Sequence, residues 1–412
     1  MLWYMARIGY IKRGAMETLK KYSAAYPCVL LTGARQVGKS TLLRKMMPKG
    51  MDYVTLDDYG ELASAQSDPA AFLETHPAPL LIDEVQYAPQ LFRAIKKKVD
   101  ENRQPGMYWM TGSQRFSHMQ NVLESLAGRV GVVELCTLSQ RETLRAAETQ
   151  VFNPSKPMEA FAAKRTCSLA KLYERIWMGG FPEMFGNPAM TRDVFFPSYV
   201  QTYIERDVST LTRVGDKSAF YKLLRSAAAH TGQLLSYSDL ARDAAVSVQT
   251  AKRWISILST SGIIHLLEPY AVKTTQRLVK SPVLHFMDTG LCAWLLDIES
   301  PQALMTHNMC GHFLETWVFG QIWRSFTNAG LVPRLNFFRN SNGAEIDLLL
   351  ERGGVLYPME VKRSLNPKLA DLKAMHSIPS SSAALGKGIV FCPIASPLPL
   401  GDGHLAFPVS AL

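Results

Sequence analysis

A glycine-rich segment that follows an apolar run has the residue types of a phosphate-binding loop. The run Val29–Thr32 has the pattern of a buried strand, and Gly33–Thr41 (GARQVGKST) has the spacing G-x-x-x-x-G-K-[ST] ahead of a helical pattern. Glycines let backbone N–H groups surround phosphate oxygens, and the amino end of the next helix adds a positive dipole. We therefore predict that the whole loop binds nucleotide phosphates: Gly33, Ala34, Arg35, Gln36, Val37, Gly38, Lys39, Ser40 and Thr41.

Two carboxylates follow a second apolar run, where they could hold a metal and activate water. Leu80–Ile82 is followed directly by Asp83 and Glu84. Because ligands bind at the carboxyl ends of parallel strands, we expect Asp83 beside Ser40, with both residues holding Mg²⁺. Lys39 is expected to reach the β- and γ-phosphates, and Glu84 to orient and polarise the attacking water. A separate glutamate after the aspartate favours a hydrolase over a small-metabolite kinase.

Two further polar residues stand at strand ends. Ser113 comes just after the apolar run Tyr108–Met110, and we predict that it senses the γ-phosphate; the alternatives are Thr111 or a plain turn. Arg129 directly precedes the run Val130–Leu135. An arginine in this position often points at the nucleotide of a neighbouring subunit and spreads the charge of the transition state. The alternative for Arg129 is a surface ion pair.

Together these motifs resemble the AAA+ ATPases, and more narrowly a bacterial and archaeal ATPase family with an uncharacterised C-terminal domain. The resemblance covers nearly the whole chain and is carried by Gly33–Thr41, Leu56–Asp58, Ile82–Gln86 with Pro89, Thr111–Gln114, Leu126–Arg129, Gly179–Glu183 and Tyr203–Val208. It implies ATP and Mg²⁺ as cofactors, a homo-oligomer such as a hexamer, and catalytic roles for Lys39, Glu84, Ser113 and Arg129. The chain departs from the family in two places. No second sensor arginine is evident after the last strand, and Cys136–Gln140 replaces the more usual Pro-Leu-Ser-Phe, which leaves the start of the lid open.

The middle of the chain has the pattern of a winged helix-turn-helix. A first helix carries apolar residues at helical spacing from Phe220 to Ala228, and Ser238 is a candidate cap for a short second helix. A third helix is expected from about residue 248 to 261, followed by a β-wing that starts at residue 263. We expect this third helix to bury Val248, Ala251, Ile255 and Leu258.

Charge in this middle segment favours DNA as a partner. Between residues 217 and 282, nine Lys or Arg stand against three Asp or Glu, a local charge of +6. Lys252 and Arg253 are predicted to meet phosphates, and Gln249 to reach a base edge. The alternative is a module that contacts only proteins.

Acidic residues and a lysine near the end of the chain suggest a second metal site. Asp347 lies on one expected strand, and Glu360 and Lys362, two apart on the next, share a face. Two carboxylates suit Mg²⁺, and a lysine beside them can steady a water or a phosphate. With Glu315 on an earlier helix, this set resembles the PD-(D/E)XK nuclease core, and the resemblance implies Asp347 and Glu360 as Mg²⁺ ligands. The alternative is a retained fold that only binds nucleic acid or partners.

Composition narrows the class of protein. Of 412 residues, 47% are hydrophobic and 19% charged, and 45 Lys or Arg against 35 Asp or Glu give a net charge of +10. This composition excludes a disordered chain, and no apolar run approaches the roughly 18 residues of a membrane span. The first residues are too short an apolar stretch for a signal peptide. Six scattered cysteines without a C-x-x-C pair argue against a zinc site or disulfide scaffold, so we expect a cytoplasmic location.

The expected fold is α/β and has four parts. They are a P-loop parallel-sheet AAA+ core (1–140), a helical lid (141–214), a winged helix-turn-helix (215–300) and a small α/β nuclease-like domain (301–412). Residues 393–412 are rich in Pro and Gly, and we expect them to be irregular. The predicted function is ATP binding and hydrolysis coupled to DNA binding, remodelling or processing. The alternatives are a nucleotide-gated signalling switch with an inactive nuclease-like domain, and a nuclease licensed by ATP.

Overall fold

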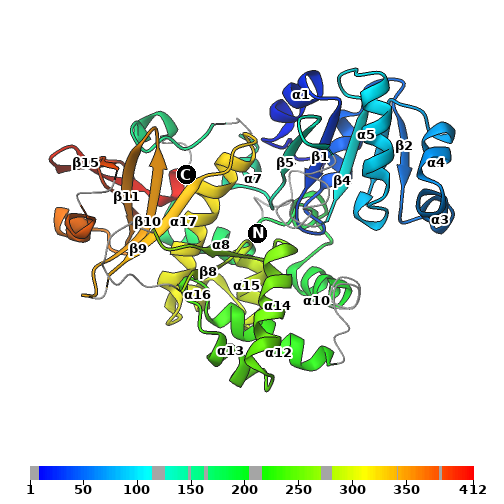
Figure 1. Ribbon diagram of the computed structural model, residues 1–412. Helices are drawn as coiled ribbons and strands as arrows, with labels where there is room; N and C mark the ends of the chain where they lie inside the picture. Colours follow the sequence, from blue (N-terminus) through cyan, green and yellow to red (C-terminus); the bar gives the residue numbers. More distant parts are fainter. Residues whose placement is uncertain are drawn as a thin grey trace.

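The computed structural model describes residues 9–113, 126–146, 150–161, 166–203, 216–270, 281–340, 342–379 and 383–412. Two pieces of the family resemblance, Gln114 and Ile204–Val208, lie outside these ranges. A parallel sheet with its helices, a mostly helical middle part and a mixed sheet at the carboxyl end follow one another along the chain (Figure 1).

A five-stranded parallel sheet forms the first part of the chain. Its strand order is β2-β3-β4-β1-β5, so β1 lies in the interior with Cys28 opposite both Tyr108 and Val130. The strand-like runs expected here are all strands, and β1, β3 and β4 are buried throughout because helices cover both faces. The elements are α1 (Met16–Ala25), β1 (Cys28–Thr32), α2 (Lys39–Met46), β2 (Asp52–Thr55), α3 (Tyr59–Ser67), α4 (Pro69–Thr75), β3 (Leu80–Asp83), η1 (Val85–Tyr87), α5 (Leu91–Glu101), β4 (Tyr108–Gly112) and β5 (Val130–Glu134).

The middle part is helical apart from a small three-stranded sheet of order β6-β8-β7. Its elements are α7 (Gln140–Thr143), η3 (Pro157–Ala160), α8 (Leu169–Met178), α9 (Glu183–Gly186), α10 (Arg192–Tyr203), α12 (Lys217–Ala229), β6 (Gln233–Leu234), α13 (Tyr237–Asp243), α14 (Val248–Thr260), β7 (Ile264–Leu267), β8 (Val283–Phe286), α15 (Thr289–Leu295) and α16 (Pro301–Thr306).

Two local expectations for this middle part were wrong. Ser236 caps α13, its hydroxyl accepting a hydrogen bond from Asp239 N at 3.3 Å, whereas Ser238 lies inside the helix. Val248 is 44% exposed because it sits at the first turn of α14, outside the buried stripe. Trp254 and Ile257 are buried along with the expected residues of this helix.

A mixed sheet of order β14-β15-β13-β11-β10-β9 ends the chain, with β12 paired to β11. The meander β9-β10-β11 is antiparallel, and β13 then joins β11 in parallel. The tail expected to be irregular instead forms the hairpin β14-β15, which extends the sheet. The elements are α17 (Cys310–Thr327), β9 (Arg334–Arg339), β10 (Glu345–Arg352), β11 (Val355–Val361), η6 (Leu369–Ser377), β12 (Ala384–Leu385), β13 (Ile389–Cys392), β14 (Leu398–Gly401), β15 (His404–Pro408) and η7 (Val409–Ala411).

The hydrophobic core is divided differently from the four expected parts. One cluster of buried residues runs from Cys136 through the middle part to Leu412, whereas the two faces of the parallel sheet have clusters of their own. Hydrogen bonds also join the lid to the elements after it, since Tyr173 Oη donates to Cys310 O at 2.9 Å and Trp177 Nε1 to Ile298 O at 2.7 Å. The lid helices therefore pack as one body with the elements after them.

All six cysteines are free. Within the described ranges, the helices fall short of the length and apolarity needed to cross a membrane.

Candidate active site

The glycine-rich loop follows β1 at its carboxyl end and requires glycine at its first position. Gly33 has φ +146°, and a Cβ added there would lie 2.1 Å from Leu135 O, in the segment that leaves β5. Gly38 has φ +91° at the start of α2. The loop therefore passes close to the backbone that follows β5 and then continues into α2. Phosphate binding needs this arrangement of strand, loop and helix.

The loop lysine and the predicted metal ligands lie together at this edge of the sheet. Lys39 is only 5% exposed, and its Nζ donates to Gly33 O at 3.0 Å and Ala34 O at 2.8 Å. Ser40 Oγ donates to Asp83 Oδ1 at 2.8 Å. The parallel register places the ends of β1 and β3 at one edge and so brings these residues together.

Two residues that the sequence did not assign to the metal site orient Asp83. Tyr53 Oη, on β2, donates to Asp83 Oδ2 at 3.1 Å, and the Thr111 hydroxyl donates to Oδ1. Thr111, the alternative γ-phosphate sensor, also accepts a hydrogen bond from Glu84 N at 2.9 Å. The Thr111 hydroxyl is therefore hydrogen-bonded to both Asp83 and Glu84. Ser113 lies one residue past the end of β4.

Glu84 is held as an ionised carboxylate. Its backbone has φ +58°, Ser113 Oγ lies 2.9 and 2.8 Å from its two carboxylate oxygens, and the Gln86 amide donates to it. Burial pushes the pKa of Glu84 upward, but the Lys39 charge and the hydrogen bonds from Gln86 and Ser113 outweigh burial and lower it. Ser113 thus contacts the predicted water-activating residue directly. Gln86 belongs to the Ile82–Gln86 motif, but no sequence pattern indicated that its amide would hold Glu84.

A cavity of about 820 Å³ opens beside the loop. It is lined by Tyr10, Gly38, Thr41, Pro182 and Phe195, which come from the amino-terminal segment, the loop and the lid helices. Ligand pockets typically measure about 300–1,000 Å³. Its place next to Gly38 suits the nucleoside of a nucleotide whose phosphates occupy the loop.

Arg13 ties the loop to the start of the lid and had no sequence signal. Its Nε contacts Glu142 Oε1 at 3.0 Å, Nη1 donates to Val37 O at 2.6 Å, and Nη2 donates to Cys136 O at 2.7 Å. Arg13 is 3% and Glu142 1% exposed. This buried pair fixes the loop against the segment that leaves β5.

Arg129 lies at the opposite edge of the sheet from its own phosphate loop. Val130 pairs with Cys28 at the amino end of β1, about four residues, or ~13 Å, from Thr32 at the carboxyl end. Arg129 Nε and Nη2 contact Asp100 Oδ1 and Oδ2 at 2.6 and 3.0 Å. Arg129 therefore makes a surface ion pair within its own chain and does not contribute to its own loop site.

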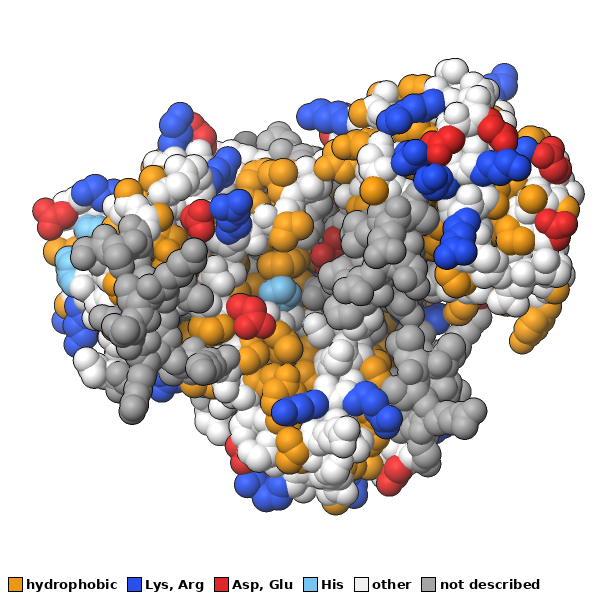
Figure 2. All heavy atoms as spheres, in the orientation of Figure 1, with side chains coloured by type: hydrophobic (Ala, Val, Ile, Leu, Met, Phe, Trp, Pro, Cys, Tyr) orange, Lys and Arg blue, Asp and Glu red, His pale blue; other side chains and the backbone are white. Residues whose placement is uncertain are grey.

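The predicted DNA-contacting residues lie on the exposed face of α14. Gln249, Lys252 and Arg253 are all exposed, and Lys252 Nζ lies 5.5 Å from the centre of the Tyr237 ring. Figure 2 shows basic side chains over the lower part of the molecule, where α12–α14 lie. The other end of this helix meets the phosphate loop, because a Cβ on Gly262 would lie 3.4 Å from the Ala34 backbone N.

Asp347, Glu360 and Lys362 lie together in the carboxyl-terminal sheet. Lys362 Nζ contacts Glu360 Oε2 at 2.7 Å, and Asp347 Oδ2 accepts a hydrogen bond from Val361 N at 2.8 Å. Burial, with repulsion from the Glu360 and Glu315 carboxylates, raises the pKa of Asp347 well above its usual range. Burial also raises the pKa of Glu360, against the opposing charge of Lys362.

The structure differs from the sequence prediction in the position of Glu315 and in the number of metal ligands. Glu315 Oε2 lies 3.2 Å from His312 Nδ1, so it pairs on its own helix. Across the described residues, no three His, Cys, Asp or Glu side chains are arranged to hold a metal ion. Glu360 Oε1 is buried, and no donor in the described part of the chain reaches it. Asp347 and Glu360 therefore offer two carboxylates, which fits Mg²⁺ completed by water and phosphate.

Three families match successive parts of the chain. Residues 25–144 match the family described as AAA domain, residues 169–302 the Domain of unknown function DUF8612, and residues 310–412 the Domain of unknown function DUF4143. The loop geometry and the AAA match agree. Residues 25–144 form a P-loop domain that is similar to the AAA domains.

Similar proteins include relatives that match along nearly the whole chain. The chain is 29% identical over 409 residues to the uncharacterized protein Rv2008c of Mycobacterium tuberculosis and, with the same values, to Mb2031c of Mycobacterium bovis, covering 97% of this chain and 84% of each relative. Among solved structures, the Walker-type ATPase PABY2304 of Pyrococcus abyssi is 14% identical, with 72% of this chain and 100% of that chain covered and a TM-score of 0.41. A single-residue variant of RuvB of Thermotoga maritima is 17% identical, with 61% and 86% covered and a TM-score of 0.27. TM-scores this low add nothing to the AAA match.

Proposed function

We propose that this chain binds ATP with Mg²⁺ and hydrolyses it at the phosphate loop. The observation that carries the proposal is the position of Glu84. It is an ionised carboxylate near Lys39, fixed by Ser113 and Gln86 at the edge of the sheet where the loop lies. An ionised carboxylate in this place is a base for the attacking water.

The residues around the loop divide the remaining tasks. Lys39 and the backbone N–H groups of the loop bind the phosphates, and Ser113 orients Glu84. Ser40 and Asp83, with oxygens 2.8 Å apart, fit Mg²⁺ because they supply the hard oxygen ligands it prefers. When bound, Mg²⁺ would neutralise charge on the phosphates.

The test is phosphate release and nucleotide binding by Glu84→Gln and Lys39→Ala, with Glu101→Gln on α5 as an exposed control. Glu84→Gln should bind ATP normally and hydrolyse it about 100-fold or more slowly, because a general base contributes about 10²–10⁴-fold. Lys39→Ala should lose nucleotide binding. Normal turnover by Glu84→Gln would refute the assignment of the base. ATP binding without turnover in the unmodified chain would favour a nucleotide-gated switch.

We further propose that the ATPase works on DNA through α14. Three observations support this: the exposed Gln249, Lys252 and Arg253 on one helix, the local excess of basic residues, and the contact between Gly262 and the phosphate loop at Ala34. That contact gives a direct route by which nucleotide at the loop affects the helix.

DNA binding and DNA-stimulated ATP turnover test this step. Lys252→Ala with Arg253→Ala should weaken binding uniformly across sequences and flatten the plot of log K against log salt by about 0.9 per lost phosphate contact on duplex DNA. Lys20→Ala with Lys21→Ala, an exposed pair on α1, should change neither. Unchanged affinity and slope in the α14 variant would assign the helix to protein contacts.

A second candidate function is DNA cleavage at the Asp347–Glu360–Lys362 cluster. The buried, donor-free Oε1 of Glu360 beside a second carboxylate favours it, because a cation between them would relieve both the repulsion and the unpaired oxygen. Asp347 and Glu360 would hold Mg²⁺, and Lys362 would contact the phosphate.

A cleavage gel run beside the ATPase assay tests the candidate nuclease. Glu360→Gln should abolish Mg²⁺-dependent cleavage and leave ATP turnover intact, and Lys362→Ala should slow cleavage by about two orders of magnitude. Glu351→Gln on the same hairpin serves as the control. Absence of cleavage by the unmodified chain on single-stranded, duplex and branched DNA would leave the domain a binding module.

We also propose that Arg129 acts on the nucleotide of a neighbouring subunit in a homo-oligomer. Its position away from its own loop is compatible with this role, and the Asp100 pair would have to open first. Mixing Arg129→Ala with Lys39→Ala chains should restore some activity at mixed junctions. If the mixed variants recover no activity although their subunits are shown to exchange, Arg129 serves only in its surface ion pair with Asp100.

A further inference from the structure

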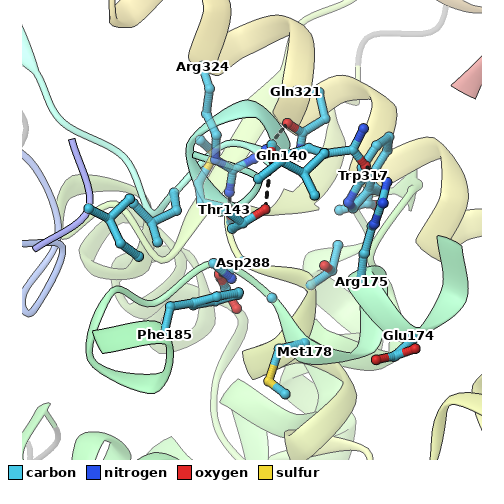
Figure 3. A pocket seen from close by; sticks show the side chains of 18 of the residues that line it. Gln140, Thr143, Glu174, Arg175, Met178, Phe185, Asp288, Trp317, Gln321 and Arg324 are labelled. Carbon is cyan, nitrogen blue, oxygen red and sulfur yellow. Dashed lines mark hydrogen bonds between the residues drawn. The ribbon is translucent and has the colours of Figure 1, made fainter. Parts of the chain in front are cut away.

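A second pocket, separate from the phosphate loop, lies where the lid, the middle part and α17 meet. Its volume is about 110 Å³, the scale of a cavity that holds a benzene ring (~150 Å³). Its walls include Leu138, Met178, Phe185, Phe286 and Trp317. In Figure 3, Phe185 and Met178 lie on the side of the pocket opposite α17. The pocket is therefore lined by apolar groups from elements that are far apart in the sequence.

One face of α17 supplies both the aromatic wall and the polar end of the pocket. Trp317, Gln321 and Arg324 are spaced i, i+4 and i+7, so they share a helix face, and all three line the pocket. An apolar cavity with a few convergent polar groups is the usual form of a small-molecule site.

Arg324 brings a buried positive charge to this pocket without a carboxylate to balance it. It is 5% exposed, Nε donates to Thr137 O at 3.1 Å, and Nη2 donates to Thr137 Oγ1 at 2.7 Å and to Met287 O. Every one of these partners is neutral, and none of the described Asp or Glu side chains pairs with Arg324. A buried cation of this kind favours an anionic ligand.

Gln321 adds an unused donor next to Arg324. The side chain is 9% exposed, and its Oε1 accepts a hydrogen bond from Gln140 N at 2.8 Å. Its amide NH₂ has no partner among the described residues. Asp288, one of the two carboxylates that line the pocket, is already occupied, since its oxygens accept from Gly180 N at 2.8 Å and Leu291 N at 3.0 Å.

We propose that this pocket binds a small aromatic carboxylate. The carboxylate group meets the Gln321 amide and the Arg324 guanidinium, and the ring lies against Trp317, Phe185 and Met178. The overall charge of the lining supports an anion, because four cationic side chains face two acidic ones and Lys171 already pairs with Glu174 at 2.7 Å. None of the phosphate-loop residues 33–41 lines this pocket.

Three probes of one shape test the proposal on the unmodified full chain by calorimetry and ligand-observed NMR. Phenylacetate should bind with an affinity at least tenfold higher than phenylacetamide, its neutral analogue, and phenethylamine, a cation, should not bind. Equal binding of the three probes, or no saturable binding of phenylacetate, would overturn the proposal.

Two variants locate the binding. Gln321→Glu should abolish phenylacetate binding by placing a negative charge at the polar end, whereas Gln302→Glu on α16, an exposed site, should leave the affinity unchanged. Leu144→Trp should block the probe by filling the pocket from its partly exposed wall. Phenylacetate binding that survives both pocket variants, each shown to be folded by circular dichroism, would place the probe elsewhere and refute the site.

Discussion

Replacing Arg13 with Met should strongly destabilise the first part of the chain. Met keeps an unbranched side chain out to the position of Nε but has no guanidinium. The substitution therefore removes the hydrogen bonds to Glu142, Val37 and Cys136 and leaves Glu142 buried without its cation. Breaking a buried ion pair by removing one partner costs about 3–5 kcal/mol. At ~2–4 °C per kcal/mol for a part of this size, the melting temperature should fall by on the order of 10 °C.

A double-mutant cycle measured by thermal unfolding separates the pair from its surroundings. Arg13→Met with Glu142→Leu should cost less than the sum of the two single changes, by about 2 kcal/mol, because the double variant buries no unpaired charge. Arg334→Met is the matched control. It breaks an Arg–Glu pair of the same 3.0 Å length to Glu351 whose arginine is 76% exposed, and it should cost under about 1 kcal/mol.

Acid provides a second measure of the same pair. Burial alone would raise the pKa of Glu142, but the Arg13 charge and hydrogen bonds from the backbone N–H groups of Ser139 and Gly14 hold it below its usual 4.5. The stabilisation is therefore complete above the unfolded value and is lost as pH falls through the lower folded pKa. The stabilising role of the buried Arg13–Glu142 pair would be refuted if the free-energy losses of the two single variants are additive. It would also be refuted if Arg13→Met costs under about 1 kcal/mol.

Three other changes have defined outcomes. The lowered pKa of Glu84 keeps it ionised, so ATP turnover between pH 8 and 6 should show no loss from its protonation, and a pH–rate profile with an acid limb near 6.5 that Glu84→Gln removes would contradict this. Gly33→Ala should destroy nucleotide binding and lower thermal stability, because its Cβ would clash with a backbone oxygen. Gly50→Ala is the control: it has φ +87° in open space and should cost only the backbone strain of about 1–2 kcal/mol. Burial and the nearby charge of His312 lower the pKa of His285 to about 3, so stability should fall as pH drops below the unfolded value of 6.5 and this imidazole should show no NMR titration between pH 8 and 5.

The ATPase site could be predicted because its residues follow strands. A buried run fixes a strand, parallel strands end at one edge, and the motifs at those ends are then brought together, as Ser40 and Asp83 are. No such rule reaches Arg13. It lies in a segment without periodicity and pairs with a residue 129 positions away, so only the packed structure brings the two together.

Two wrong predictions of local structure, the cap of α13 and the irregular tail, have causes in the neighbouring residues. Ser236 and Ser238 are both good caps, and sequence pattern cannot choose between serines two residues apart; the structure places Ser236 at the helix start. In the carboxyl-terminal tail, Gly401 and Gly403 have φ +91° and +78° and form the turn of a hairpin. Glycines that suggested irregular chain were in fact the turn residues of two paired strands.

The single hydrophobic cluster that runs from the lid to the carboxyl end bears on how this protein should be cut into pieces. The parallel sheet has its own clusters on both faces, so a fragment ending near residue 144 keeps its core and the buried Arg13–Glu142 pair. A cut near 214 or 300 would instead open the large cluster and expose the buried faces of α8 and α17 to water. The molecule should therefore unfold as two cooperative units, and nucleotide should stabilise both, because the cavity beside the loop is lined by residues of each. Fragments made at the other borders should aggregate.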